Sequence, residues 1–203
     1  PSPCRLACPM GSDIPRWVHL VEQGKLAEAW RELVRYNPFP AITGRVCPAP
    51  CRRECNRGPF DEAVDVPSLE RFVGDYGLEH GLRVEAWPRP ARAGRVAVVG
   101  AGPAGLTAAY CLSLEGHAVT VFEALPVAGG MLAAGIPEYR LPKEVLSAAL
   151  SAIKNASLEI CTGTALGRDF SLQDLQTRGY EAVLLAVGAQ RDLKLGIHGE
   201  DLE

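Results

Sequence analysis

Apolar residues recur at helical spacing in the first part of the chain. The first predicted helix begins after Ser12 or Asp13, either of which can cap it, and ends at Gly24. A second helix follows over residues 26–34, and Pro67 opens a third. Between the second and third helices the chain is punctuated by proline and glycine, which predicts a loop.

From residue 96 onward the pattern changes to short apolar runs that alternate with longer helical ones. Residues 96–99 and 118–122 suit strands buried on both faces, and a glycine turn and a helix over 104–115 lie between them. This order is typical of a βαβ unit. The alternation continues with a helix over 143–155, a strand over 158–162, a short helix over 171–178 and a buried strand over 182–187.

The two patterns divide the chain into two domains. Residues 1–82 are predicted to form a small all-α domain, residues 83–95 a linker without clear periodicity, and residues 96–203 an α/β Rossmann-like domain. Composition supports this division, because twelve of the sixteen prolines lie before residue 96 and five of the seven cysteines before residue 56.

Length and charge exclude several classes of protein. The 203 residues have a formal net charge of −3, with 22% charged and 47% hydrophobic residues, which is untypical of nucleic-acid-binding or disordered proteins. No apolar stretch approaches the roughly 20 residues of a membrane span. The first residues do not resemble a signal sequence. We therefore expect no nucleic-acid partner, no membrane span and a location in the cytoplasm or another reducing compartment.

A glycine-rich motif follows the first predicted strand. Gly100, Gly102 and Gly105 match G-x-G-x-x-G at the point where a strand ends and a helix begins. Such a loop binds a pyrophosphate at the helix N-terminus. Glu123, at the end of the next strand, is placed to accept hydrogen bonds from adenosine ribose hydroxyls, and an acid there disfavours a 2′-phosphate. These residues predict a dinucleotide site.

Five cysteines form two groups in the helical domain, namely Cys4 and Cys8, and Cys47, Cys51 and Cys55. Their spacing favours iron–sulfur ligation, because thiols four residues apart share a helix face. Structural zinc is less favoured, since it usually binds C-x-x-C pairs or histidines. Disulfides fit poorly with five cysteines in one short region, and unliganded buried thiols seldom occur in such numbers.

Three longer runs carry a resemblance to a known family. Residues Asn37–Pro40, Thr43–Cys51 and Val98–Leu106 are similar to the small (beta) subunit of glutamate synthase, to the N-terminal part of dihydropyrimidine dehydrogenase and to related reductases. The resemblance covers essentially the whole chain. It implies a [4Fe–4S]-binding helical domain followed by an FAD-binding Rossmann-like domain.

The family pattern also implies which residues hold the clusters. Cys8, Cys47 and Cys51 match ligands of one [4Fe–4S] cluster, with Glu70 as the expected fourth ligand. A solvated helix acid is the alternative for Glu70, and Cys4 or Cys55 could replace it as the fourth ligand. Cys4 and Cys55 match ligands of a second cluster, whose remaining C-x-x-C pair would lie upstream of this chain. We expect one cluster, with two allowed.

The flavin contacts implied by the resemblance lie in the Rossmann-like domain. They are Ala101, Gly102, Pro103, Ala104 and Gly105 of the loop that Gly100 opens, followed by Glu123, Gly130, Met131, Arg140 and Leu166. The alternative for Arg140 is a surface arginine. The family inserts an NAD(P)H domain about where this chain stops, so the resemblance implies only the first half of the FAD domain and a chain cut at its C-terminus, with its N-terminus undecided.

The resemblance implies an oxidoreductase module that passes electrons between NAD(P)H, FAD and a [4Fe–4S] cluster. NAD(P)H would take part only through the further domain. The expected partner is a redox subunit such as a glutamate synthase large subunit or another iron–sulfur protein. No side chain is a convincing acid, base or nucleophile, so no catalytic residue is predicted. The alternative is a non-catalytic electron-transfer or assembly subunit that needs another polypeptide for flavin.

Overall fold

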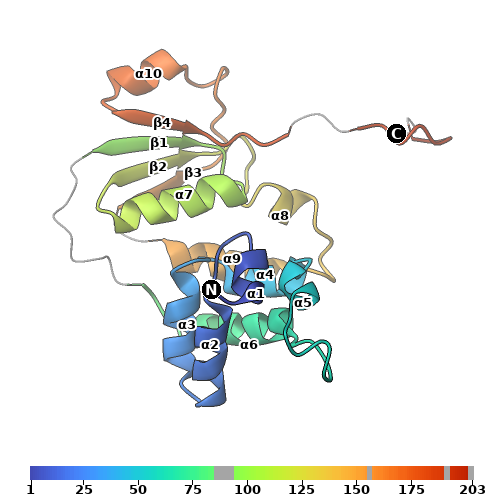
Figure 1. Ribbon diagram of the computed structural model, residues 1–203. Helices are drawn as coiled ribbons and strands as arrows, with labels where there is room; N and C mark the ends of the chain where they lie inside the picture. Colours follow the sequence, from blue (N-terminus) through green and yellow to red (C-terminus); the bar gives the residue numbers. More distant parts are fainter. Residues whose placement is uncertain (85–93, 155–156, 190–192, 201–203) are drawn as a thin grey trace.

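The computed structural model describes residues 1–84, 94–154, 157–189 and 193–200. A helical region, residues 1–84, precedes a sheet region, residues 94–200 (Figure 1). Most of the predicted linker, residues 85–93, lies outside the described residues, and its last residue, Arg95, is the first residue of a strand. No helix in the described part of the chain is long and apolar enough to span a membrane.

The helical region contains the three predicted helices and three short ones. In order they are α1 (Pro3–Ala7), α2 (Ile14–Glu22), α3 (Leu26–Val34), α4 (Pro40–Val46), α5 (Pro50–Arg53) and α6 (Val66–Glu79). The expectation of a loop between α3 and α6 was wrong at α4 and α5. Each of these helices has a proline in its first turn, which fixes φ for helix entry, and each is too short to show helical periodicity in the sequence.

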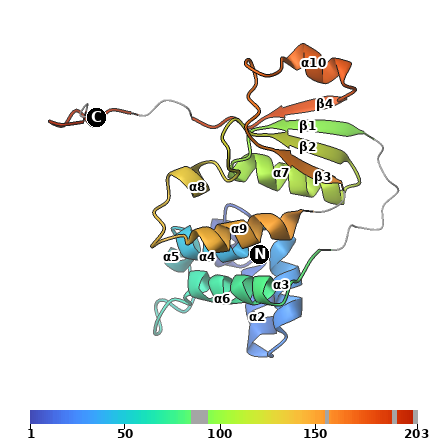
Figure 2. The same ribbon diagram turned by 180° about the vertical axis from the view of Figure 1, so that it is seen from behind.

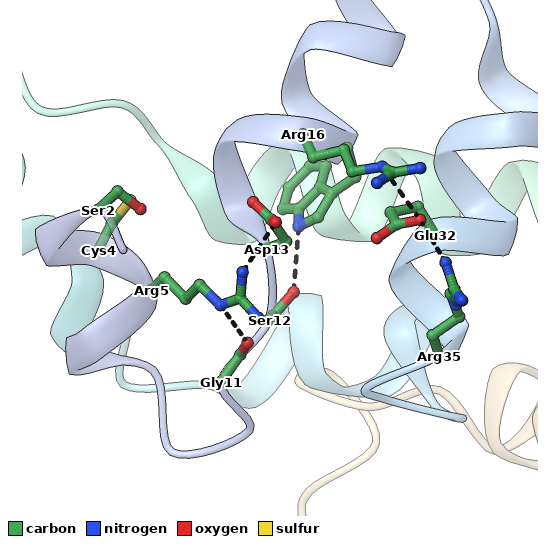
Figure 3. A network of polar contacts seen from close by, with 10 residues as sticks. Ser2, Cys4, Arg5, Gly11, Ser12, Asp13, Arg16, Glu32 and Arg35 are labelled. Carbon is green, nitrogen blue, oxygen red and sulfur yellow. Dashed lines mark hydrogen bonds and ion pairs between the residues drawn. The ribbon is translucent and has the colours of Figure 1, made fainter.

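The side chains expected to cap α2 are used elsewhere. Ser12 Oγ accepts a hydrogen bond from the Trp17 indole N–H at 3.2 Å, and Asp13 Oδ2 accepts one from the Arg5 guanidinium at 2.9 Å (Figure 3). Trp17 is fully buried, and a buried indole N–H needs an acceptor. Satisfying this tertiary contact therefore outweighs local capping by Ser12.

The sheet region is a four-stranded parallel sheet with helices, as predicted. Its elements are β1 (Arg95–Val99), α7 (Pro103–Leu114), β2 (Ala118–Phe122), α8 (Met131–Ala134), α9 (Lys143–Ile153), β3 (Leu158–Cys161), α10 (Leu172–Thr177) and β4 (Ala182–Leu185). The strand order is β3-β2-β1-β4 (Figures 1 and 2). The carboxyl ends of the parallel strands meet at one edge, where open α/β sheets bind their ligands.

The last strand departs from expectation. The sequence predicted a buried strand over 182–187, whereas β4 ends at Leu185, and Leu184 and Leu185 are 38% and 53% exposed. β4 is an edge strand that pairs only with β1 in the described sheet. An apolar run predicts a strand, but only the surrounding elements decide whether that strand is covered.

The two regions share part of their core. Phe39 and Ile42, at the start of α4, belong to the same buried cluster as Val98 of β1 and Leu146 of α9. In both views α9 lies between the sheet and the helical region (Figures 1 and 2). A separate core inside the helical region is built around Trp17, Leu33 and Val73. Helix α4 therefore joins the two regions through buried apolar contacts as well as through the chain.

Candidate functional sites for an iron–sulfur cluster and a dinucleotide

Three of the predicted cluster cysteines meet Glu70 in the helical region. Cys8, Cys47, Cys51 and Glu70 line one cavity of about 130 Å³. They come from four separate parts of the chain, namely the end of α1, the end of α4, α5 and α6. Buried apolar side chains, including Trp17 and Leu33, line the same cavity. A low-dielectric shell of this kind is one of the means by which proteins tune a cluster.

The turn between Cys47 and Cys51 has a strained backbone. Ala49 has a φ of 52°, which makes it the one non-glycine residue with positive φ in the described chain. Its backbone N–H points at Cys47 Sγ, with an N–S distance of 3.3 Å. Pro50 then starts α5 and brings Cys51 back to the cavity. Strain of this kind is maintained by the surrounding structure and is often found at functional sites.

Cys51 shows that the thiols lie close together. Burial, together with charge repulsion from the neighbouring Cys47, Cys8 and Cys4, raises the pKa of its thiol to about 11. Several thiolates cannot share an apolar cavity without a cation to offset their charge. The cavity therefore fits a positively charged iron core, which would stabilise the thiolate forms.

Glu70 is held by a polar network inside the cavity. Its Oε1 accepts hydrogen bonds from Asn37 Nδ2 at 2.8 Å and from the Thr43 hydroxyl. Burial raises the pKa of Glu70, and these two hydrogen bonds oppose that rise. Within the described residues no hydrogen bond reaches its Oε2. The alternative of a solvated helix acid was therefore wrong, and one carboxylate oxygen is oriented while the other remains available as a ligand.

Cys4 lies beside the cavity without lining it. Its Sγ is 3.2 Å from Ser2 Oγ, and its thiol is near enough to contribute to the raised pKa of Cys51. Helix α1, which carries it, has no buried residue. The next residue, Arg5, ties this segment down by donating from Nε to Gly11 O at 3.1 Å and by pairing with Asp13 (Figure 3). Polar contacts therefore contribute to holding the Cys4–Cys8 segment in place.

Cys55 does not line the cavity. Hydrogen bonds from the backbone at Val64, Arg57 and Gly58 lower the pKa of its thiol. The structure thus brings Cys8, Cys47, Cys51 and Glu70 to one cavity, with Cys4 next to this set and Cys55 outside the cavity lining.

The described side chains do not form a compact site for a single metal ion. Among residues 1–84, 94–154, 157–189 and 193–200, no three cysteine, histidine or acidic side chains converge closely enough to bind one ion. A tetrahedral zinc site needs Zn–S distances of about 2.3 Å. His19 is exposed on α2, where it contacts Glu22 and Gln23. Cys8, Cys47 and Cys51 line a common cavity instead.

The glycine loop of the sheet region has the geometry of a pyrophosphate site. Gly100 has a φ of 107°, and a Cβ there would lie 2.3 Å from Ala186 O. A Cβ on Gly105 would lie 2.0 Å from Gly100 O, so helix α7 packs directly on the loop. A Cβ on Gly102 would meet nothing within 4 Å, so this side of the loop is open to a ligand.

Glu123 is built into this loop. Its Oε2 accepts a hydrogen bond from Ala101 N at 2.7 Å, and its Oε1 accepts one from Leu125 N at 2.9 Å. The residue is 7% exposed and lines the cavity. A carboxylate has about four lone-pair positions, so both oxygens can still accept from ribose hydroxyls. The acid therefore shapes the loop as well as facing the ligand, a role that the sequence did not reveal.

A second cavity, of about 510 Å³, surrounds the loop. The predicted residues that line it are Gly100, Gly102, Pro103, Ala104, Glu123, Gly130, Met131 and Leu166. Ala101 is buried beneath the loop. Gly130 has a φ of 53°, and a Cβ there would lie 2.8 Å from Gly102 Cα, so its close approach requires glycine.

Arg140 is not among the residues that line this cavity. Its Nε donates instead to the carbonyl of Arg45 at 3.0 Å, which joins the sheet region to the end of α4. The structure therefore places Arg140 between the two regions, where it is an exposed arginine with a defined hydrogen bond, and it does not support the flavin contact implied by the resemblance.

Comparison with known proteins agrees with both cavities. Residues 1–82 match the family described as dihydropyrimidine dehydrogenase domain II, 4Fe–4S cluster, and residues 98–153 match an NAD(P)-binding Rossmann-like domain. The glutamate synthase [NADPH] small chain of Bacillus subtilis is 39% identical over 96% of this chain. The chain is similar to this small chain over nearly its whole length. The predicted order of an iron–sulfur domain and a Rossmann-like domain is confirmed.

Other relatives work in different enzymes. The NADP(+)-dependent formate dehydrogenase subunit beta of Moorella thermoacetica is 39% identical, and the NADPH-Fe(3+) oxidoreductase subunit beta of Geobacter sulfurreducens is 40% identical, each over 98% of this chain. The chain covers 31%, 30% and 39% of the Moorella, Geobacter and Bacillus proteins, respectively. The shared part is thus common to several redox enzymes.

Proposed function

We propose that this chain is the iron–sulfur and FAD-binding part of an NAD(P)H-dependent oxidoreductase subunit. Electrons would pass from NAD(P)H through FAD to a [4Fe–4S] cluster and on to a partner. The observation that carries the proposal is the cavity lined by Cys8, Cys47, Cys51 and Glu70, in the same chain as the open glycine loop.

Each cavity supplies the groups that its cofactor needs. Cys8, Cys47 and Cys51 would bind cluster iron as thiolates, and Glu70 would complete the ligand set through Oε2. The backbone N–H groups at the start of α7 would bind the pyrophosphate, and Glu123 the ribose. FAD, when bound, takes electrons as a pair and releases them singly. The protein itself binds and orients the cofactors and excludes water.

The partner of the complete protein is a second part of this proposal. Relatives are named as small or beta subunits, which supports assembly with another subunit. We propose a redox subunit, either a glutamate synthase large subunit or another iron–sulfur protein. The free thiols that line the cluster cavity support a reducing compartment such as the cytoplasm.

A rival function is a non-catalytic electron-transfer or assembly subunit that needs another polypeptide for flavin. Val187 lines the dinucleotide cavity and is 49% exposed, so this edge of the cavity is accessible to a further polypeptide as well as to the flavin. A further polypeptide on this side would cover it.

Anaerobic purification followed by analysis of iron, sulfide and flavin separates the two functions. The oxidoreductase predicts about four iron and four sulfide per chain together with tightly bound FAD. Iron and sulfide without FAD would support the rival, and stoichiometric zinc without iron would exclude both. Electron paramagnetic resonance after reduction tests whether the iron is present as a cluster.

A further inference from the structure

Arg45 occupies an unusual position in the last turn of α4, two residues before Cys47. Its Nη1 and Nη2 donate to the two carboxylate oxygens of Asp75 on α6 at 2.7 and 2.9 Å. Nη1 also donates to Ala41 O at 2.7 Å. The side chain is only 9% exposed. Its guanidinium is therefore fixed by a bidentate, charge-assisted pair, which lysine could not reproduce.

Helices α4 and α6 also approach each other at a distance that only glycine allows. A Cβ on Gly44 would lie 2.3 Å from Arg71 N, and a Cβ on Gly74 would lie 2.3 Å from Ala41 N. The backbones are thus in contact, and Arg45 and Asp75 join the same two helices beside this contact. Sliding or rotation of α4 would break the bidentate pair.

The position of α4 determines the position of Cys47. Cys47 is the C-cap of the helix, and its backbone N–H donates to Thr43 O at 2.8 Å. At its other end α4 contributes Phe39 and Ile42 to the core shared with the sheet region. The carbonyl of Arg45 accepts the hydrogen bond from Arg140, in the segment that follows Met131 of the dinucleotide cavity.

We propose that Arg45 is a positioning residue that fixes the cysteine-bearing end of α4 against α6. Its side chain holds Cys47 at the cluster cavity, and its backbone ties this point to Arg140, in the segment that follows the residues lining the dinucleotide cavity. The inference rests on the proposed function in one respect, namely that Cys47 is a cluster ligand. It adds a residue that touches neither cofactor and acts through Cys47.

The test compares Asp75→Asn with Arg71→Ala in the complete protein. Asp75→Asn keeps the side-chain size but removes the charge-assisted pair. Arg71 is the matched control, because it pairs with the same carboxylate, with its Nε 3.6 Å from Asp75 Oδ2, through a side chain that is 58% exposed. Asp75→Glu, which keeps the carboxylate, is the conservative variant.

Two measurements are made on each variant. The first is the rate at which iodoacetamide alkylates Cys47 in protein freed of iron, resolved by peptide mass spectrometry. The second is the rate at which NAD(P)H-derived electrons reach the cluster, followed by rapid-freeze electron paramagnetic resonance, with flavin content as a control for folding. We expect Asp75→Asn to speed alkylation and to slow electron arrival, each about tenfold. Arg71→Ala should change neither, and Asp75→Glu should restore both in part.

The inference is overturned if iodoacetamide alkylates Cys47 at the same rate in Asp75→Asn as in Arg71→Ala. It is also overturned if Asp75→Asn and Asp75→Glu are equally impaired, because the carboxylate would then not be the active group. Failure of the proposed function has a different signature, which is the absence of iron and flavin from the unmodified protein. In that case the alkylation comparison still decides whether Arg45 positions Cys47.

Discussion

The two cofactor cavities are built in different ways. In the dinucleotide cavity the loop Gly100–Gly105 presents its backbone, and this loop and Glu123 lie in one contiguous stretch of sequence, while residues around Gly130, Leu166 and Val187 complete the lining. The cluster cavity is formed by side chains from four separate segments, and Cys8 and Glu70 lie 62 positions apart. A backbone-built site tolerates changes that keep the turn, whereas a side-chain-built site depends on how helices pack.

The largest expected effect is at the cluster cavity. Cys51→Ser should lower bound iron more than about tenfold while FAD content is unchanged, because a hydroxyl is a poor iron ligand. Iron analysis and visible spectra of anaerobic protein measure both quantities. Cys161→Ser in β3 is the control and should retain iron. Full iron content in Cys51→Ser would remove the central claim about this cavity.

The glycine loop offers a matched pair of substitutions. Gly105→Ala should lower the free energy of unfolding by about 4 kcal/mol, because its Cβ would lie 2.0 Å from Gly100 O and the backbone would have to move. Gly102→Ala should leave stability nearly unchanged, since nothing lies within 4 Å of its Cβ, but should weaken FAD binding. Urea unfolding and flavin titration separate the two effects. Equal stability of both variants would contradict the assigned packing.

The shared core predicts coupling between the two regions. Ile42→Ala should lower the free energy of unfolding by about 3 kcal/mol, because Ile42 is 1% exposed and packs with the sheet region. Hydrogen exchange should then show lower protection in β1 as well as in α4. Val73→Ala, in the separate helical core, is the control and should spare β1. If Val73→Ala lowers the protection of β1 as much as Ile42→Ala does, the helical core is not separate from the core shared with the sheet region.

A smaller effect is expected at Glu123. Glu123→Ala leaves the N–H groups of Ala101 and Leu125 without their acceptor, which should cost about 2 kcal/mol of stability and lower FAD affinity about tenfold. Glu123→Gln keeps one oxygen acceptor, and its loss of stability should be about half that of Glu123→Ala. Thermal unfolding and flavin titration test this, and an unchanged FAD affinity in Glu123→Ala would discredit the ribose contact.

The smallest effect concerns pH at the face of α7 that meets the helical region. Burial raises the pKa of Tyr110 to about 12, above the value of about 10 in unfolded chains. The stability contributed by the neutral phenol is therefore complete below pH 10 and is lost as pH rises through 12. Between neutral pH and pH 11 the free energy of unfolding of the unmodified protein should fall by about 1 kcal/mol more than that of Tyr110→Phe. If the free energy of unfolding falls with pH equally in the unmodified protein and in Tyr110→Phe, Tyr110 is not buried in solution.

Much of the fold could be predicted from the sequence. The strand Ala118–Phe122 and the dinucleotide loop follow from apolar runs and glycine spacing, which are local signals. The segments containing α4 and α5 were misjudged because proline-initiated helices of a few residues show no periodicity. Cysteine spacing could predict iron–sulfur ligation, and the family resemblance implied which cysteines are ligands. The contacts of Asn37 and Thr43 with Glu70 could not be predicted, because they join residues up to 33 positions apart.

The sequence by itself determined most of the longer elements, the order of the two domains and the chemistry of both sites, because these depend on residue types and on spacing along the chain. Only the tertiary structure decided which thiols share a cavity, that Glu123 is bound into the loop, that Arg140 reaches Arg45, and that β4 is exposed. The physical reason is that these features depend on contacts between distant segments. Helix and strand periodicity describes one face of one element and does not specify its neighbours.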